Sequence, residues 1–231
     1  GRPVPIGYSI YSLLDRRRLY FINGLDKFAL KWWGGFDSNA LVHAAADTLL
    51  EAGENGLIYL VKLNTSYNPA KKQIALDPRV TRYRYKSSLS RKLGVENSLA
   101  VYKNLAYFAD NDGLLQCLDL NTLSPVWVRD VADDTDSTIV LEEGGGGVFL
   151  YTGCEVDNQG RDGLAYARKI NALTGELVWE RSYRCLYEEI NGGIIGTPLA
   201  GKNDLRDLVV FNLAKYGRGR GGKLIALNKS D

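Results

Sequence analysis

Four carboxylates crowd one short stretch of the chain, and carboxylates this close together could bind a metal ion. They are Asp130, Asp133, Asp134 and Asp136. Oxygen ligands of this kind suit Ca²⁺. The stretch lacks the Asp-x-Asp-x-Asp-Gly spacing of a calcium-binding loop, so we interpret it as a solvated connection. Asp133, Asp134 and Asp136 are kept as weak calcium candidates, and no other metal site is predicted.

Acid–base or nucleophilic catalysis has little to build on in this sequence. His43 is the single histidine, and a lone histidine is more often a hydrogen-bonded structural residue than a general base. One histidine also excludes a multi-histidine metal site. No Gly-x-Ser-x-Gly turn is present to expose a nucleophilic serine. We therefore predict no catalytic residue and favour a protein that is not an enzyme.

The three cysteines, Cys117, Cys154 and Cys185, do not have the spacing of zinc ligands. We expect Cys117 to be a buried structural thiol. Cys154 and Cys185 could pair in an oxidising compartment, although the odd number of cysteines argues against it.

Aromatic side chains provide one candidate ligand platform. Trp32, Trp33, Tyr83 and Tyr85 cluster in two short stretches, and exposed aromatic rings suit glycans or partner proteins. The alternative, which we favour, is that these rings fill space between structural repeats.

Charge and hydropathy exclude several classes of partner. The 231 residues carry 29 basic and 27 acidic groups, a net charge of +2, which is too balanced to indicate nucleic-acid binding. No apolar run reaches the roughly 18 residues of a membrane-spanning helix. The sequence begins at Gly1 and contains no Met, as expected after leader cleavage, after trimming, or where residues are missing from the sequence.

A repeated pattern of strands indicates the elements that must position these residues. Alternating apolar strands follow Gly56, Gly113, Gly163 and Gly222, at intervals of roughly 50 to 60 residues. Each glycine fits a tight turn between two strands, and the interval suits one four-stranded sheet per repeat. The pattern predicts an all-β protein, a β-propeller of four-stranded antiparallel blades.

Two copies of the repeat share a longer motif. Each carries an Asx and a Thr before a tryptophan at matching spacing: Asp119, Thr122 and Trp127 in one, and Asn171, Thr174, Gly175 and Trp179 in the other. Gly175 suits a turn that requires positive φ. The pattern resembles the tryptophan-docking repeat of the pyrroloquinoline-quinone-like (PQQ-like) β-propellers. In that family these residues are structural, and each tryptophan packs between neighbouring blades.

The resemblance implies three alternative functions. The first, which we favour, is a non-catalytic binding or assembly module for a protein, peptide or glycan. The second is a quinoprotein dehydrogenase that binds PQQ and Ca²⁺, although the adjacent cysteine pair of those enzymes is absent. The third is a carbohydrate-active enzyme on a propeller scaffold. Members of the family are usually exported, so an extracytoplasmic location is expected, and no bound cofactor is expected.

We predict that residues 1–231 form one propeller region, as part of a larger ring. The expected blades are 7–36, 37–95, 96–132, 133–190 and 191–231, with at least the last one incomplete. Inner strands are expected at 38–43, 97–101, 136–140 and 196–200, because small or polar residues there lead into apolar ones. A further strand is expected at 27–32.

Overall fold

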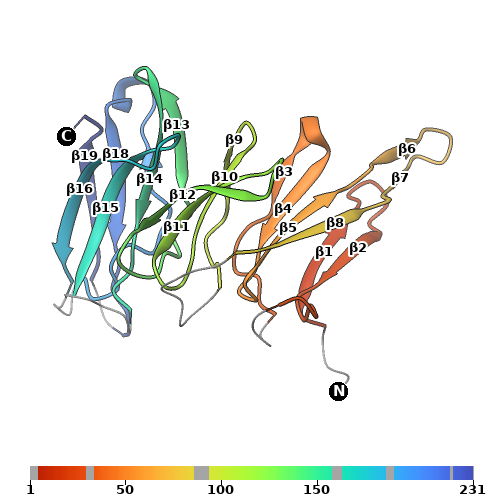
Figure 1. Cartoon of the computed structure of the whole chain (residues 1–231), viewed down its shortest axis with the longest axis horizontal. Coiled ribbons are helices and arrows are strands. Elements are labelled where there is room, and N and C mark those ends of the chain that lie inside the picture. Colours follow the sequence, from red (N-terminus) through yellow and green to blue (C-terminus); the bar gives the residue numbers. More distant parts are fainter. Residues whose placement is uncertain are drawn as a thin grey trace. The chain divides into compact units, whose positions relative to one another are not determined.

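The computed structural model describes residues 5–29, 34–85, 94–157, 163–185, 190–218 and 221–230 (Figure 1). The chain divides into two compact units, which are described separately below. Unit 1 comprises Gly1–Lys86 and Leu93–Glu96, and unit 2 comprises Ser87–Lys92 and Asn97–Asp231. Regular structure in both is almost entirely antiparallel β-sheet.

Unit 1, coloured red to yellow in Figure 1, contains one four-stranded sheet and two hairpins. The sheet runs in the order β3 (Leu41–His43), β4 (Thr48–Ala52), β5 (Leu57–Lys62) and β8 (Arg79–Arg84). The hairpins are β1 (Gly7–Tyr11) with β2 (Arg18–Asn23), and β6 (Ser66–Asn68) with β7 (Gln73–Ala75). A short 3₁₀ turn, Ala44–Ala46, joins β3 to β4.

Unit 2, coloured green to blue in Figure 1, contains three successive sheets. The first is β9 (Ala100–Tyr102), β10 (Leu105–Ala109), β11 (Leu114–Asp119) and β12 (Ser124–Asp130). The second is β13 (Val140–Gly144), β14 (Gly147–Gly153), β15 (Leu164–Asn171) and β16 (Leu177–Arg184). The third has three strands within the described residues, β17 (Leu199–Ala200), β18 (Leu208–Leu213) and β19 (Lys223–Asn228).

The glycines that define the repeat adopt the backbone conformation that their turns require. Gly56, Gly113, Gly163 and Gly222 have φ of 80°, 83°, 65° and 92°, which side chains with a Cβ adopt at a cost. Each precedes the third strand of its sheet. The predicted fold class, a β-propeller of four-stranded antiparallel blades, is confirmed by the sheets of the two units.

The inner strands begin later than the sequence predicted. The expected strand at 97–101 begins at Ala100 instead, and the expected strand at 136–140 begins at Val140. Side chains bind neighbouring backbone in place of the missing strand hydrogen bonds. Asn97 Nδ2 donates to Ala109 O at 2.6 Å, and Ser137 Oγ donates to Gly153 O at 3.1 Å. The polar residues that suggested strand starts therefore anchor the entry segments by their side chains.

The segment after β2 also departs from prediction. Residues 27–29 form a turn rather than the strand expected at 27–32, and Phe28 N donates to Asp26 Oδ1 at 3.0 Å. This local hydrogen bond favours a turn over a strand. The remaining positions of that prediction lie outside the described residues.

The core of each unit lies on the faces of its sheets. Tyr59, Leu57 and Leu49 belong to one buried cluster in unit 1. In unit 2, one cluster surrounds Tyr107 and Leu150, and a second joins the β13–β16 sheet to the β17–β19 sheet. No helix within the described part of the chain has the length and apolar character that crossing a membrane demands.

Candidate binding sites

Trp179, on β16, lies in the buried cluster that joins the second and third sheets of unit 2. Its indole is only 6% exposed and donates from Nε1 to Lys229 O at 3.0 Å. The ring packs against Tyr151 in its own sheet and Phe211 in the next, with centroid distances of 6.2 and 6.4 Å. One side chain thus supplies both apolar contact and a hydrogen bond between two sheets.

Trp127, on β12, makes the corresponding contacts between the first and second sheets of unit 2. Its Nε1 donates to Ala172 O at 2.9 Å. Gly175 has φ of 74°, as predicted, and a Cβ built there would lie 2.7 Å from Cδ2 of the Trp127 ring. Gly175 therefore serves both the turn and the close approach of the indole. We propose a structural docking role for both tryptophans.

The other residues of the motif form the turns that follow β11 and β15, and the turn after β15 carries the carbonyl of Ala172. Asp119 Oδ1 accepts from the backbone N–H of Thr122 at 3.1 Å, and Asn171 Oδ1 accepts from that of Thr174 at 3.2 Å. Thr174 Oγ1 in turn accepts from Glu176 N at 3.2 Å. The Asx and Thr positions thus fix turn geometry.

Unit 1 has no tryptophan at the corresponding place on β8. Cys117 and Lys169 pair with Trp127 and Trp179 in their sheets, whereas Leu60 pairs with the exposed Thr81. The outer strand of unit 1 is held by a different residue type. Arg82 forms an ion pair with Asp26 and lies over the Phe28 ring, 5.5 Å from its centroid.

An apolar groove of about 600 Å³ lies in unit 1 between the β1–β2 hairpin and the β6–β7 hairpin. Its lining is almost entirely apolar: Ile10, Tyr11, Ser12, Leu13, Leu14, Leu19, Leu63, Thr65, Ile74 and Leu76. Leu13 is 94% exposed, and Tyr11 and Leu14 are each more than half exposed. Large exposed apolar side chains beside a groove are typical of a surface that binds a partner.

Hydrogen bonds hold the two hairpins that form this groove. Arg17 Nη2 donates to Ile74 O at 3.0 Å, which ties the β1–β2 turn to β7. Within the turn, Ser12 N donates to Arg17 O at 2.9 Å, and Arg17 pairs with Asp15. The groove is therefore formed before any ligand arrives, which lowers the entropic cost of binding.

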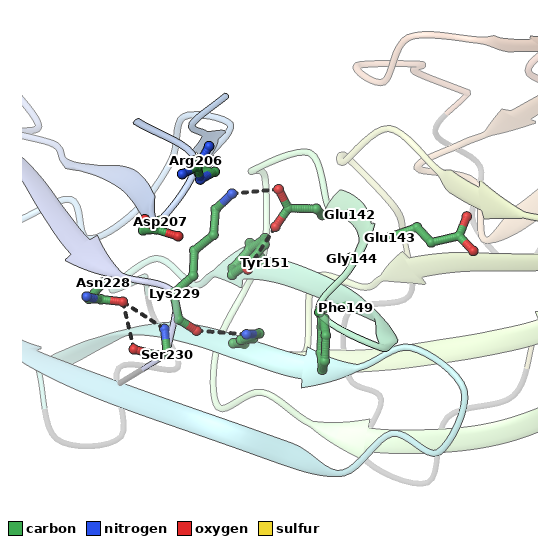
Figure 2. A pocket seen from close by; sticks show the side chains of 12 residues that line it. Glu142, Glu143, Gly144, Phe149, Tyr151, Arg206, Asp207, Asn228, Lys229 and Ser230 are labelled. Atoms are coloured by element: carbon green, nitrogen blue, oxygen red, sulfur yellow. Dashed lines mark hydrogen bonds and ion pairs between the residues drawn. The ribbon is translucent and has the colours of Figure 1, made fainter. Parts of the chain in front are cut away.

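A second cleft, of about 550 Å³, lies in unit 2 between the β13–β14 turn and the end of β19 (Figure 2). Figure 2 shows Lys229 reaching Glu142, with Nζ 2.5 Å from Oε1, while Tyr151 Oη donates to Glu142 Oε2 at 3.1 Å. Lys169 Nζ donates to Lys229 O at 2.7 Å and lies 4.2 Å from the centroid of the Phe149 ring.

The charged groups of this cleft interact mainly with one another. Burial lowers the pKa of Lys169, the nearby Lys229 lowers it further, and Glu142 opposes both. Burial raises the pKa of Tyr151, and its hydrogen bond to Glu142 acts in the same direction. Lys229 and Glu142 neutralise each other's charge. We therefore interpret the cleft as a polar contact between two sheets rather than as a site that attracts an ion.

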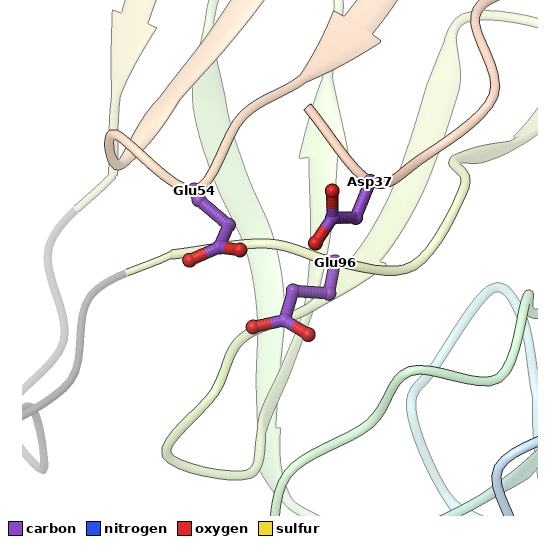
Figure 3. Close-up of side chains that lie close together, drawn as sticks. All are labelled: Asp37, Glu54 and Glu96. Carbon is purple, nitrogen blue, oxygen red and sulfur yellow. The ribbon is translucent and has the colours of Figure 1, made fainter. Parts of the chain in front are cut away.

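Unit 1 contains a cluster of three carboxyl groups that the sequence did not predict. Asp37, Glu54 and Glu96 come from three separate segments (Figure 3), and one carboxylate oxygen of each lies within 4.8 Å of the others. Asp37 is exposed and the other two are partly exposed. Glu54 and Glu96 make other interactions as well. Exposed acids can cluster at modest cost in water, so the grouping alone does not define a metal site.

The calcium candidates of the sequence are not solvated, which corrects our interpretation of that segment. Asp133 and Asp134 are buried, and Asp136 is partly buried. Backbone N–H groups of two segments hold the Asp133 carboxylate, since Asp134 N donates to Oδ1 at 2.8 Å, and Asp157 N, from the segment after β14, donates to Oδ2 at 3.2 Å. Burial raises the pKa of Asp134 to about 7, with Asp136 the next cause.

The predicted aromatic platform is only partly described. Trp32 and Trp33 lie outside the described residues. Tyr83 is partly buried, and burial raises its pKa. Tyr85 is fully buried, and its hydroxyl accepts from Gly94 N at 2.7 Å. Including Tyr85 in an exposed platform was therefore wrong, because its ring fills the interior and its hydroxyl is already satisfied.

The remaining chemical candidates have structural surroundings. His43 Nδ1 accepts from Ala46 N at 3.1 Å and caps the short 3₁₀ turn. Cys117, Cys154 and Cys185 are free and buried, and burial raises the pKa of all three thiols. These separate thiols do not fit the quinone site of the dehydrogenases, in which two cysteines are adjacent.

No protein-family model and no curated protein matches the sequence. Among solved structures, BamB from Moraxella catarrhalis overlaps 93% of this chain with a TM-score of 0.51 and 15% identity. Quinohemoprotein alcohol dehydrogenase from Comamonas testosteroni overlaps 58% of this chain with a TM-score of 0.44 and 20% identity. A europium-containing methanol dehydrogenase also overlaps 58% of this chain, with a TM-score of 0.39 and 16% identity.

The fold shared with BamB defines this chain as a β-propeller. The chain spans 53% of the length of BamB, 19% of the alcohol dehydrogenase and 23% of the methanol dehydrogenase. At this level of identity the likeness concerns the fold, and function must be argued from the sites themselves.

Proposed function

We propose that this chain is a non-catalytic propeller module that binds an apolar segment of a partner protein. The observation that carries the proposal is the groove of unit 1, where the side chains of Leu13, Leu14 and Tyr11 are exposed beside partly buried apolar side chains. Burial of these three side chains by a ligand would remove apolar surface from water, which is the main driving force of protein association.

The composition of the groove favours a peptide over a glycan. Its lining is aliphatic apart from Tyr11, Ser12 and Thr65. Glycans require a denser set of hydrogen-bonding groups around an aromatic platform. Aliphatic side chains of a peptide need only matching shape and apolar surface, so a protein or peptide ligand fits this lining better.

The experiment selects peptides from a random phage-displayed library on the purified chain and measures binding of a synthetic peptide by fluorescence polarisation. Leu13→Asp should weaken the affinity at least about tenfold, because it places a charge in the apolar contact. Leu224→Asp is the matched control, since Leu224 is also highly exposed but lies on β19 of unit 2. The proposal would be overturned if both variants weakened the peptide affinity equally. It would also be overturned if Leu13→Asp did not weaken the binding of any selected peptide.

We also propose that the module works outside the cytoplasm. The support is the resemblance to PQQ-like propellers, whose members are usually exported, and the fold now shared with BamB. Fractionation of the native cells followed by antibody detection tests this location. Recovery of the protein with cytoplasmic markers would contradict it.

A further inference from the structure

Basic side chains border one end of the apolar groove in unit 1. The β1–β2 turn meets the β6–β7 hairpin at this end, because Arg17 Nη2 donates to Ile74 O at 3.0 Å. Arg16 precedes Arg17 in the first turn, and Lys71 and Lys72 directly precede β7 in the second. Lys72 is two residues from the groove residue Ile74, a distance of about 7 Å along an extended chain. Its long side chain therefore reaches the mouth of the groove.

The charges of these basic residues are available to a ligand. Arg16, Lys71 and Lys72 are exposed, and their side chains form no ion pair or hydrogen bond with the residues that the structure describes. Arg17 differs, because its Nε lies 3.2 Å from Asp15 Oδ2, which neutralises its charge. Three positive charges at this end of the groove thus lack a counter-charge within the described part of unit 1.

Acidic side chains lie at the opposite end of the groove, at the base of the β6–β7 hairpin. Asp77 is exposed and follows the groove residue Leu76. Asp47 is held by the groove residue Thr65, whose Oγ1 donates to Asp47 Oδ1 at 2.6 Å. Hydrogen bonds from Thr65 lower the pKa of Asp47, and the charge of Lys62 acts in the same direction. The groove is therefore basic at the hairpin turns and acidic at the hairpin base.

We propose that the groove binds a protein segment in which acidic residues adjoin the apolar residues that fill the groove. The inference rests on the proposed peptide-binding function and adds the chemistry of the partner. Apolar residues of the segment contact Leu13 and Leu14, and its carboxylates lie at the turns near Arg16 and Lys72. Complementary charges at the rim of an interface speed the encounter and set the direction of the bound segment.

An anionic membrane is the other surface that these residues could meet, since anionic lipids attract basic segments and accept apolar side chains. The shape of the site favours a protein segment. The groove is a concave volume of about 600 Å³ lined by residues of both hairpins. A bilayer would cover the exposed Leu13 and Leu14 but would leave most of this volume unfilled, whereas an extended peptide fills it.

The experiment analyses the peptides that a random library yields on the purified chain. Peptides whose binding Leu13→Asp weakens should be enriched in Asp and Glu beside their apolar residues. Fluorescence polarisation then measures their affinity at two salt concentrations. The affinity should fall at least about fivefold between about 0.05 M and about 0.5 M NaCl, because salt screens exposed charges.

Arg16→Glu/Lys72→Glu tests the basic end directly. The double variant reverses two exposed charges and leaves every groove-lining side chain in place. An acidic peptide should bind it at least about fivefold more weakly than the wild type at low salt. Lys103→Glu/Lys202→Glu is the matched control, because it changes the net charge equally at exposed residues of unit 2. Lys103 also has φ of 54°, against 55° at Arg16. The control variant should bind the peptide as the wild type does.

A peptide whose acidic residues are replaced by lysine provides the reciprocal test. It should bind the wild type weakly and regain affinity for the Arg16→Glu/Lys72→Glu variant. A variant that had lost its fold or the shape of its groove would not gain affinity for any peptide. The regained affinity therefore reports the charge of the groove end and nothing else.

Two results would overturn the acidic partner and leave the groove proposal intact. One is that the peptides weakened by Leu13→Asp show no excess of Asp and Glu. The other is that these peptides bind wild type and Arg16→Glu/Lys72→Glu equally. If Leu13→Asp weakens no peptide, the proposed function itself fails. Leu13-dependent binding to vesicles of equal parts phosphatidylcholine and phosphatidylglycerol, without any such peptide, would assign the surface to a membrane instead.

Discussion

The outer strands of the two units are held to their neighbours by different chemistry. In unit 2, the indoles of Trp127 and Trp179 cross to the next sheet, and each donates to a backbone carbonyl there. In unit 1, the exposed Thr81 occupies the corresponding position, and Arg82 contacts Asp26 and Phe28 near the surface.

The difference teaches where the stability of a repeat protein resides. A buried indole removes a large apolar surface from water and satisfies its own N–H, whereas a partly exposed guanidinium gains little from an ion pair in water. We therefore expect the sheets of unit 2 to depend on their tryptophans far more than unit 1 depends on its arginines.

The largest effect is expected from Trp179→Ala. The substitution leaves a cavity between Tyr151 and Phe211 and removes the hydrogen bond to Lys229 O. The free energy of unfolding should fall by about 3 to 5 kcal/mol. Equilibrium unfolding in urea measures it, and a loss below about 1 kcal/mol would show that the indole does not hold the two sheets together.

Glu51→Gln should change how the stability of the chain depends on pH. Burial raises the pKa of Glu51 in unit 1 to about 7, against the lowering effect of Ser38, whose Oγ lies 2.6 Å from Glu51 Oε1. Because the folded pKa lies above the unfolded one, wild-type stability falls as pH rises from about 4.5 to about 7, by about 3 kcal/mol from this group.

Urea unfolding of both proteins below and above this range checks the sign. The glutamine variant should gain stability relative to the wild type as the pH rises, since it carries no ionisable group there. A constant difference between the two proteins at every pH would contradict the raised pKa.

Gly175→Ala should cost about 1 to 3 kcal/mol of stability, because it adds a Cβ against the Trp127 ring at a residue with positive φ. Gly145→Ala is the matched control, since Gly145 has φ of 60° but open space around it. The excess loss in Gly175→Ala measures the contact with the indole. Equal losses in urea would mean that only the backbone conformation matters.

The smallest effect is expected from Arg82→Ala. The variant removes an ion pair with Asp26 and the contact with Phe28 in unit 1. We expect a loss of about 1 kcal/mol or less, and less still at high salt, because the arginine is partly exposed. A loss as large as that of Trp179→Ala would erase the contrast between the units.

Much of the fold followed from residues with a single physical requirement. Gly113 and Gly175 need positive φ, and the structure has φ of 83° and 74° at these positions. The alternating strands after the repeat glycines formed where they were expected. Local patterns of this kind are readable because backbone conformation and strand period are set by neighbouring residues.

Features that depend on distant residues were not predicted. Asp134 is buried because Glu155 and Tyr216, far along the chain, pack around the same place, and charge alone suggested a solvated loop. The apolar groove and the carboxyl cluster of unit 1 are likewise formed by residues from segments that are separate in the sequence. A buried acid leaves no local signal in a sequence, since the same residue types also occupy exposed turns.

Hydrogen exchange followed by mass spectrometry, comparing Trp179→Ala with the wild type, tests the central claim most directly. The account predicts much faster exchange in β18 and β19, which lose the indole contacts to Phe211 and Lys229 O, and unchanged exchange in β4 and β5 of unit 1. Unchanged exchange in β18 and β19 would contradict the claim that tryptophan docking joins the sheets of unit 2.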